Sequence, residues 1–290
     1  MKNHILSVML HLGCLALRAA EPAPTTTPQI IPLWPDGDRN NPANGPRPMM
    51  EIFRPFAPET ALPATIMICP GGGYAMLSPY ERLFAEFFRS LGYTAVVVSY
   101  RLAPNRHPAA YADATRAIRL LRTHGDEWKL PIKRIALMGG SAGGHLAALV
   151  ATRPDYYRDE SDDLAATVSA RPDRLILAYP VISAVASYRH NSLNGILGSN
   201  PSNELRNDAS PERHVSKDTP PVFLFHASGD KNLSVDNSID FSRACWAVGV
   251  PAELHIFPHN GHGRTFAYSS EISPRWRELL SGWLTAWLKE

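Results

Sequence analysis

The stretch Ile135-Ala-Leu-Met-Gly-Gly-Ser-Ala-Gly-Gly-His-Leu-Ala-Ala-Leu-Val150 decides the fold. Its first four residues are apolar and predict a short buried strand, whereas the alanines and leucines after His145 favour a helix. Between them lies Gly139-x-Ser141-x-Gly143. A strand that reverses into a helix at one residue strains that residue and crowds its neighbours, so glycine is needed there. The pattern predicts a nucleophile elbow that exposes the Ser141 hydroxyl. The alternative is a plain glycine-rich turn in which the serine only caps the helix.

Around this stretch, strand and helix patterns alternate. The chain has 290 residues, 44% of them hydrophobic, which allows one large α/β domain or two small ones. The expected strands cover residues 50–55, 64–69, 94–100, 135–138, 175–179, 222–227 and 253–257. The expected helices cover residues 79–91, 109–124, 235–248 and 275–288, besides the helix after Ser141. Such alternation predicts an α/β fold with a mostly parallel central sheet and helices on both faces. We expect one domain over 49–290, preceded by an irregular lead-in over 21–48.

The first 20 residues differ from the rest. Lys2 is followed by a mostly apolar run, and small residues precede Glu21, which is typical of a secretory signal peptide. We therefore expect a secreted or periplasmic protein. Removal of residues 1–20 would take Lys2 and Arg18 from the 29 basic residues and so balance the 27 acidic ones. A neutral chain gives no reason to expect a nucleic-acid or membrane partner.

Two further features bear on the organisation of the chain. Cys69 and Cys245 would remain after cleavage, and both are expected to be free thiols in the core. Residues 183–220 are polar and lie between two expected strands. They should cross above the carboxyl edge of the sheet, where ligands bind in open α/β sheets, and form a small polar lid.

A serine nucleophile needs a base and an acid, and both are available after Ser141. Asp230 follows one expected strand and His262, flanked by glycines, follows the next, so both should project from the edge that carries Ser141. The rivals for these two roles are Asp236, His259, His255, His226 and His145. None of the histidines has metal-ligand spacing, so we expect no metal site.

An oxyanion site requires two backbone N–H groups beside the attacked carbonyl. One should come from Ala142, directly after the nucleophile. The other should come from Gly72 or Gly73, because glycine lets the backbone approach a substrate closely. Tyr74 next to this loop is expected either to line an acyl pocket and bind substrate or simply to pack.

Several further motifs stand out along the chain: Pro70-Gly-Gly-Gly-Tyr74, Tyr100-Arg-Leu-Ala-Pro104, His107-Pro108, Asp113 with Arg116-Ala-Ile-Arg119, Gly140-Ser-Ala-Gly-Gly-His145 and Pro251-Ala-Glu-Leu-His255. Together they resemble the α/β-hydrolase esterases, and more narrowly the secreted bacterial branch with acetylxylan and related carbohydrate esterases. The resemblance implies a triad of Ser141, Asp230 and His262. Three departures separate the chain from hormone-sensitive-lipase-like esterases: Pro70 replaces a histidine, Gly140 replaces a common aspartate, and Asp230 lies in Ser-Gly-Asp-Lys instead of an acidic pair.

From the residues and this resemblance we expect a cofactor-free serine esterase that removes acetyl groups from acylated plant cell-wall oligo- or polysaccharide of the xylan type. A feruloyl esterase would use the same machinery with a roomier apolar slot. A serine peptidase of the prolyl-oligopeptidase type and an inactive hydrolase-fold binding module are the remaining alternatives. The oligomeric state stays open.

Overall fold

The computed structural model describes residues 27–42, 46–164, 167–269 and 271–290. The signal peptide expected over residues 1–20 lies outside these ranges. Within them, no helix combines the length and the apolar character that crossing a bilayer would demand.

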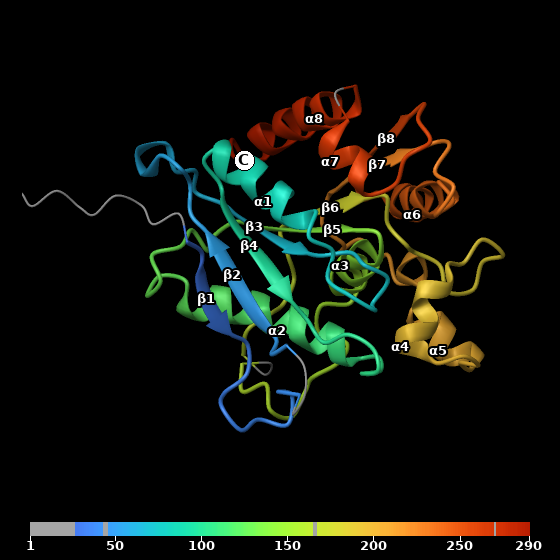
Figure 1. Cartoon of the computed structure of the whole chain (residues 1–290), viewed down its shortest axis with the longest axis horizontal. Helices are drawn as coiled ribbons and strands as arrows, with labels where there is room; N and C mark the ends of the chain where they lie inside the picture. Colours follow the sequence, from blue (N-terminus) through green and yellow to red (C-terminus); the bar gives the residue numbers. More distant parts are fainter. Residues whose placement is uncertain (1–26, 43–45, 165–166, 270) are drawn as a thin grey trace, which may run out of the picture.

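The core of the molecule is one eight-stranded sheet (Figure 1). Its strands are β1 (Gln29–Pro32), β2 (Met49–Phe53), β3 (Thr65–Cys69), β4 (Thr94–Ser99), β5 (Ile135–Gly140), β6 (Arg174–Ala178), β7 (Val222–Ala227) and β8 (Ala252–Phe257). They are ordered β1-β2-β4-β3-β5-β6-β7-β8, and β2 runs antiparallel to both of its neighbours while the other pairs are parallel. The expected mostly parallel sheet is therefore confirmed.

Helices cover both faces of the sheet. On one face lie α1 (Glu81–Ser90) and α8 (Ile272–Trp287), and on the other lie α2 (Ala109–His124), α3 (Ala142–Thr152) and α6 (Asp236–Ala247) (Figure 1). Strand β5 serves both layers: Met138 joins the cluster with α1 and α8, whereas Leu137 joins the cluster with α2 and α3. Successive side chains of a strand point to opposite faces, so a central strand of a two-sided sheet is apolar throughout.

The beginning of the chain corrects one expectation. The lead-in over 21–48 was expected to be irregular, yet Gln29–Pro32 form β1 and pair antiparallel with β2. This strand is four residues long and ends at a proline, which an edge strand tolerates because one side of its backbone needs no partner. Trp34, just beyond it, is buried and donates its indole N–H to Asp113 at 2.7 Å.

The 183–220 segment is tied to the body of the protein. It contains the short elements η2 (Asn191–Leu193), α4 (Asn194–Leu197), α5 (Asn203–Asp208) and η3 (Pro211–Arg213). The Arg106 guanidinium donates to the carbonyl oxygens of Asn194 and Gly195, at 3.1 and 2.8 Å. The His107 amide donates to the Ile196 carbonyl at 2.9 Å. The remaining short helices, η1 (Pro58–Thr60) and α7 (Arg264–Tyr268), lie in other connections.

Candidate active site

The turn between β5 and α3 has the geometry of a nucleophile elbow. Ser141 has φ 53° and ψ −120°, a left-handed conformation that non-glycine residues rarely adopt. A Cβ atom at Gly139 would lie 2.1 Å from the Gly143 carbonyl oxygen, and one at Gly143 would lie 2.1 Å from that of Cys69. No Cβ atom can be accommodated at 2.1 Å from a backbone oxygen. Both positions therefore require glycine.

Gly140, the residue that distinguishes this elbow from lipase-like ones, is also explained by its surroundings. A Cβ atom there would lie 3.2 Å from the Tyr179 hydroxyl and 3.3 Å from Glu81 Oε1. The carboxyl group of Glu81, from α1, already occupies the space in front of residue 140. An aspartate at this position would bring a second carboxyl group against it.

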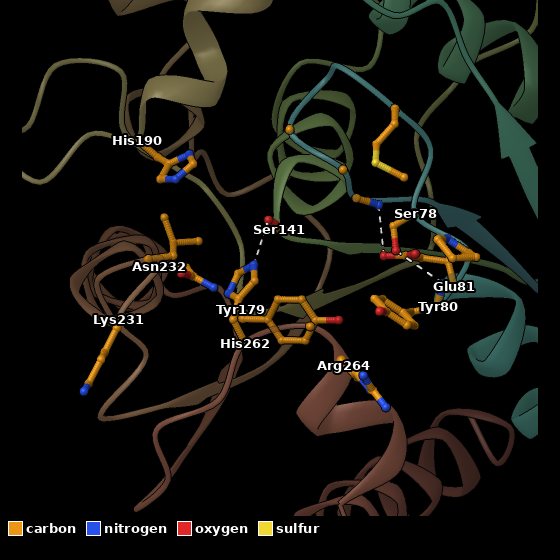
Figure 2. A pocket seen from close by; sticks show the side chains of 17 residues that line it. Ser78, Tyr80, Glu81, Ser141, Tyr179, His190, Lys231, Asn232, His262 and Arg264 are labelled. Carbon is orange, nitrogen blue, oxygen red and sulfur yellow. Dashed lines mark hydrogen bonds between the residues drawn. The ribbon is translucent and has the colours of Figure 1, made fainter.

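The structure brings Ser141, His262 and Asp230 together, and Figure 2 shows the contact between Ser141 and His262. His262 Nε2 lies 3.0 Å from Ser141 Oγ, and His262 Nδ1 lies 2.6 Å from Asp230 Oδ2. An ionised carboxylate only accepts, so Nδ1–H donates to Asp230 and Nε2 accepts the Ser141 hydroxyl. The three side chains come from the loops after β5, β7 and β8, all at the carboxyl edge of the sheet.

The surroundings of Asp230 hold it ionised. Its Oδ1 accepts the amides of Asn232 and Leu233 at 2.9 and 3.1 Å, and its Oδ2 also lies 3.4 Å from Nε2 of His226. Burial alone would raise the pKa of Asp230, but the hydrogen bonds from His226 and His262 and the charge of His262 outweigh it. The net pKa is well below the usual range, which suits a group that stabilises an imidazolium.

The rival residues lie elsewhere or support the triad. The Asp236 carboxylate accepts the Ser234 hydroxyl at the start of α6, and His255 pairs with Glu253. His226 is buried, with Nδ1 2.8 Å from the Ser238 hydroxyl, and it contacts Asp230 from behind. Among the described residues, His259 makes no side-chain hydrogen bond to the triad.

The glycine loop after β3 lines the same cavity as Ser141. Gly72 and Gly73 have φ 110° and 68°, and a Cβ atom at Gly72 would lie 2.2 Å from the Met76 carbonyl oxygen. The Gly71 amide is occupied, because it donates to Glu81 Oε1 at 2.9 Å. Over the part of the chain that is described, the amides of Gly72, Gly73 and Ala142 donate no hydrogen bond. Within that part, these amides are therefore free of other partners, and their role as oxyanion donors stays a prediction.

Tyr74 corrects the expectation that it binds substrate. Its side chain is buried, and its hydroxyl contacts His145 Nδ1 at 2.8 Å instead of lining the cavity. His145 Nε2 lies 2.7 Å from the Ala209 carbonyl oxygen, so Nε2 carries the proton and Nδ1 accepts from Tyr74. Burial lowers the pKa of His145 to about 4, so the ring is neutral near pH 7. Tyr74, with φ 60°, anchors the glycine loop to α3 and to the 183–220 segment.

The triad opens into a cavity of about 790 Å³. In Figure 2, His190, Lys231 and Asn232 lie on one side of the Ser141–His262 pair, and Ser78, Tyr80, Glu81 and Arg264 lie on the other. Sequence reasoning did not single out these seven residues. Tyr179, which also lines the cavity, follows β6 directly, and its place at the carboxyl end of a parallel strand is the one signal that could have identified it.

Over the described ranges, no three side chains of His, Cys, Asp or Glu gather as a metal site requires. That the protein needs no metal or other cofactor stays a prediction. Both remaining cysteines, Cys69 and Cys245, are buried free thiols, as expected.

Comparison with known proteins places this geometry in context. A family model described as BD-FAE matches residues 50–245. The chain is 32% identical over 223 residues to endo-1,4-beta-xylanase B of Butyrivibrio fibrisolvens, covering 75% of this chain and 34% of that protein. It is 29% identical over 236 residues to an acetylxylan esterase of Xylanibacter ruminicola, covering 79% and 47%. The chain thus spans about a third to a half of these relatives.

Among solved structures, the acetyl ester-xyloside bifunctional hydrolase of Caldicellulosiruptor lactoaceticus is similar over nearly its whole length. The TM-score is 0.80 at 39% sequence identity, with 89% of this chain and 96% of that chain covered. An esterase of Thermogutta terrifontis, solved with propionate bound, gives a TM-score of 0.72 at 26% identity, with coverage of 93% and 97%. The expected α/β-hydrolase fold is therefore confirmed.

Proposed function

The chain belongs to the BD-FAE family, and from that premise we propose that it is a serine carboxylesterase that removes acetyl groups from xylan-type carbohydrate. One observation carries the proposal: Ser141, His262 and Asp230 are joined by hydrogen bonds of 3.0 and 2.6 Å in a cavity that glycine amides also line. A nucleophile, a base and an orienting carboxylate within this reach are what acyl transfer requires.

The first half of the reaction forms an acyl-enzyme. Ser141 Oγ attacks the ester carbonyl while its proton passes to His262 Nε2. The amides of Gly72 or Gly73 and of Ala142 stabilise the oxyanion of the tetrahedral intermediate. The imidazolium, held by Asp230, then gives its proton to the departing sugar oxygen as the C–O bond breaks.

The second half frees the serine. Water takes the place of the departed sugar, and His262 Nε2 removes one of its protons as the water oxygen attacks the acyl carbonyl. A second tetrahedral intermediate forms in the same oxyanion site. It collapses when the imidazolium returns the proton to Ser141 Oγ, releasing acetic acid and the original enzyme.

The carbohydrate substrate rests on the relatives and on the lining of the cavity. Two similar proteins are named acetylxylan esterase and acetyl ester-xyloside bifunctional hydrolase. The larger part of the lining is apolar, and polar side chains such as Ser78, Glu81 and Asn232 are set among it. A sugar has C–H faces for the apolar surface and hydroxyls for the polar groups, so such a mixed wall can hold it. The volume of about 790 Å³ also admits a feruloyl group, which makes feruloyl esterase activity the second candidate.

A substrate panel tests the proposal. Acetylated xylan, acetylated xyloglucan, acetylated pectin and feruloylated arabinoxylan are each incubated with the protein, and released acetate and ferulate are quantified. We expect acetate release to be fastest from xylan. Faster release of ferulate would favour the feruloyl esterase instead. Binding of xylo-oligosaccharide without any released acid would identify an inactive binding module, and cleavage of a prolyl peptide would identify a peptidase.

We also propose that the protein is exported, on the composition of residues 1–20 alone. Expression of the full chain in a Gram-negative host, followed by N-terminal sequencing of the periplasmic or secreted fraction, should give a mature protein that starts at Glu21. Recovery of an uncleaved chain in the cytoplasmic fraction would contradict export.

A further inference from the structure

On one side of the triad, the cavity is lined by Ser78, Tyr80, Glu81, Tyr179 and Arg264 (Figure 2), and this side is called the arm. Two of these side chains are almost fully buried: Glu81, at 2% exposure, and Tyr179, at 1%. Each has a polar atom with no hydrogen-bond partner among the described residues, namely Glu81 Oε2 and the Tyr179 hydroxyl. Leaving a buried polar group without a partner costs stability, so such atoms call for an explanation.

The two side chains meet in front of Gly140. The Tyr179 hydroxyl and Glu81 Oε1 both lie within 3.3 Å of the position that a Cβ atom on Gly140 would take. Tyr179 has φ 37°, a conformation unusual for a residue with a large side chain, and it lies at the carboxyl end of β6. Backbone strain of this kind is maintained where the surrounding structure fixes a residue for a purpose.

The rim of the same arm is aromatic. Tyr80 lines the cavity and contacts Tyr268 edge to face, with ring centroids 6.1 Å apart. The Tyr268 side chain is 59% exposed, and the Arg264 guanidinium lies 5.7 Å from its ring. The arm thus offers exposed aromatic surface at its mouth and unpartnered carboxyl and hydroxyl oxygens on its two buried side chains. A pyranose ring has matching parts, since its C–H faces are apolar and its edges carry hydroxyls.

The arm also lies where the alcohol of the ester must leave. The Tyr179 ring contacts the His262 imidazole, with centroids 4.8 Å apart, and Arg264 follows His262 closely in the chain (Figure 2). His262 protonates the leaving oxygen in the proposed mechanism, so the group attached to that oxygen lies beside this ring.

We propose that this arm is the sugar subsite, in which Glu81 and Tyr179 exchange hydrogen bonds with free hydroxyls of the acetylated xylose and the Tyr80–Tyr268 pair contacts its ring. The inference rests on the proposed esterase function. It assigns to Glu81 a second role besides holding the Gly71 amide. Glu81→Gln separates the two roles, because the amide keeps one carbonyl oxygen for Gly71 and replaces the oxygen that lacks a partner.

The test compares three esters of the same acid: a monoacetylated methyl β-xyloside, the fully acetylated methyl xyloside, and 4-nitrophenyl acetate. The first has free ring hydroxyls, the second has the ring without them, and the third has neither. For Tyr179→Phe and Glu81→Gln we expect kcat/KM on the monoacetylated xyloside to fall about tenfold or more relative to the other two esters. Asn232→Ala, on the opposite side of the triad, is the matched control and should leave the ratio between the esters unaltered.

Other outcomes overturn the assignment. Equal losses of kcat/KM on all three esters would show that Glu81 and Tyr179 maintain the catalytic geometry and bind no sugar hydroxyl. A larger loss on methyl ferulate than on the xyloside would make the arm an acyl pocket. If the unmodified protein hydrolyses 4-nitrophenyl acetate but no xyloside, the proposed function and the subsite both fall. If it hydrolyses xylosides and the variants are unselective, only the subsite falls. Should Glu81→Gln fold poorly by its urea midpoint, Tyr179→Phe decides alone.

Discussion

The two turns that meet at Ser141 differ in how much side chains contribute to holding them. The elbow, Gly139–Gly144, is shaped by backbone packed against backbone, with no room for a Cβ at Gly139 or Gly143. The glycine loop that we propose as the oxyanion loop, Pro70–Tyr74, is tight at Gly72, which lies against the Met76 carbonyl, but open around Gly73, where the nearest atom to an added Cβ is 3.6 Å away. Side chains hold this loop as well. Glu81 binds the Gly71 amide, and the Tyr74 hydroxyl binds His145.

The difference indicates how easily the backbone of each turn can shift. A turn fixed by close backbone contact cannot shift by a few tenths of an ångström without unpacking, which suits the atom that attacks. A turn held by side-chain hydrogen bonds can be adjusted by changing one side chain, which suits donors that must match a substrate. The two turns touch where Gly143 lies against the carbonyl groups of Cys69 and Pro70.

The largest effect should come from the residue at the apex of the elbow. Ser141→Ala removes the nucleophile and should lower kcat by about 10⁴–10⁶-fold, while the tight backbone around it keeps the fold intact. Initial rates on 4-nitrophenyl acetate and the urea unfolding midpoint measure the two expectations. Substantial activity in this variant would refute the assignment of Ser141.

The next effect contrasts glycines from the two turns. Gly143→Ala places a methyl group 2.1 Å from the Cys69 carbonyl oxygen and should cost about 3 kcal/mol of unfolding free energy or more. Gly73→Ala meets no close atom and should cost about 1–2 kcal/mol, the strain of a left-handed residue. Urea titrations of both variants provide the comparison. Equal costs would mean that the elbow is no tighter than the oxyanion loop.

Acidification should loosen the anchor of the oxyanion loop. The folded pKa of His145 is about 4, and an unfolded histidine titrates near pH 6.5. Between these values the unfolded chain binds more protons, so stability falls as pH decreases, by roughly 3 kcal/mol in total for this group. Burial lowers the pKa values of His107, His190 and His214 as well, which adds in the same direction.

Unfolding free energies measured between pH 7 and pH 5 test this, since ordinary carboxyls stay ionised there in the unfolded chain. The His145 ring resonances should not titrate in that range. A ring that protonates near pH 6.5 in the folded protein would contradict the prediction.

The smallest effect concerns the side-chain tether itself. Tyr74→Phe leaves the buried His145 Nδ1 without its donor and should cost about 1–2 kcal/mol of stability, with a several-fold loss in kcat as the oxyanion loop relaxes. Thermal or urea unfolding and kcat on 4-nitrophenyl acetate are the measurements. Leu77→Ala, a partly buried substitution near the same loop without this hydrogen bond, is the control for general loosening. An unchanged kcat in Tyr74→Phe would show that the hydrogen bond between Tyr74 and His145 does not affect catalysis.

Much of this architecture could be predicted from local patterns. The strand at Val222–Ala227 and the helix at Ala109–His124 have the bounds that their periodicity predicts. Ser141, Asp230 and His262 could be matched because each follows a strand of a parallel sheet, and such strands end at one edge. Helix α8 begins at Ile272 instead of Arg275, since Pro274 falls in the first turn, where its missing N–H is not needed.

What escaped prediction depends on contacts between distant segments. Glu81 has the position of an ordinary acidic residue in the first turn of a helix, and only the approach of Gly140 and Tyr179 gives it a place in the cavity. The sequence leaves Tyr74 open between lining an acyl pocket and packing, and only its contact with the buried imidazole of His145, which is distant in the chain, decides for packing. Strand β1 was too short and too proline-rich to leave a periodic signal.

The attachment of the 183–220 segment has a consequence for kinetics. Because Arg106, His107 and His145 all bind its backbone, the wall that it contributes beside the triad is already in position before any ester arrives. Hydrolysis of a water-soluble ester should therefore follow a simple saturation curve, with no lag and no jump in rate when the ester begins to form droplets. On a polymeric substrate, an acetyl group would have to enter a cavity whose wall does not open to admit the polymer chain.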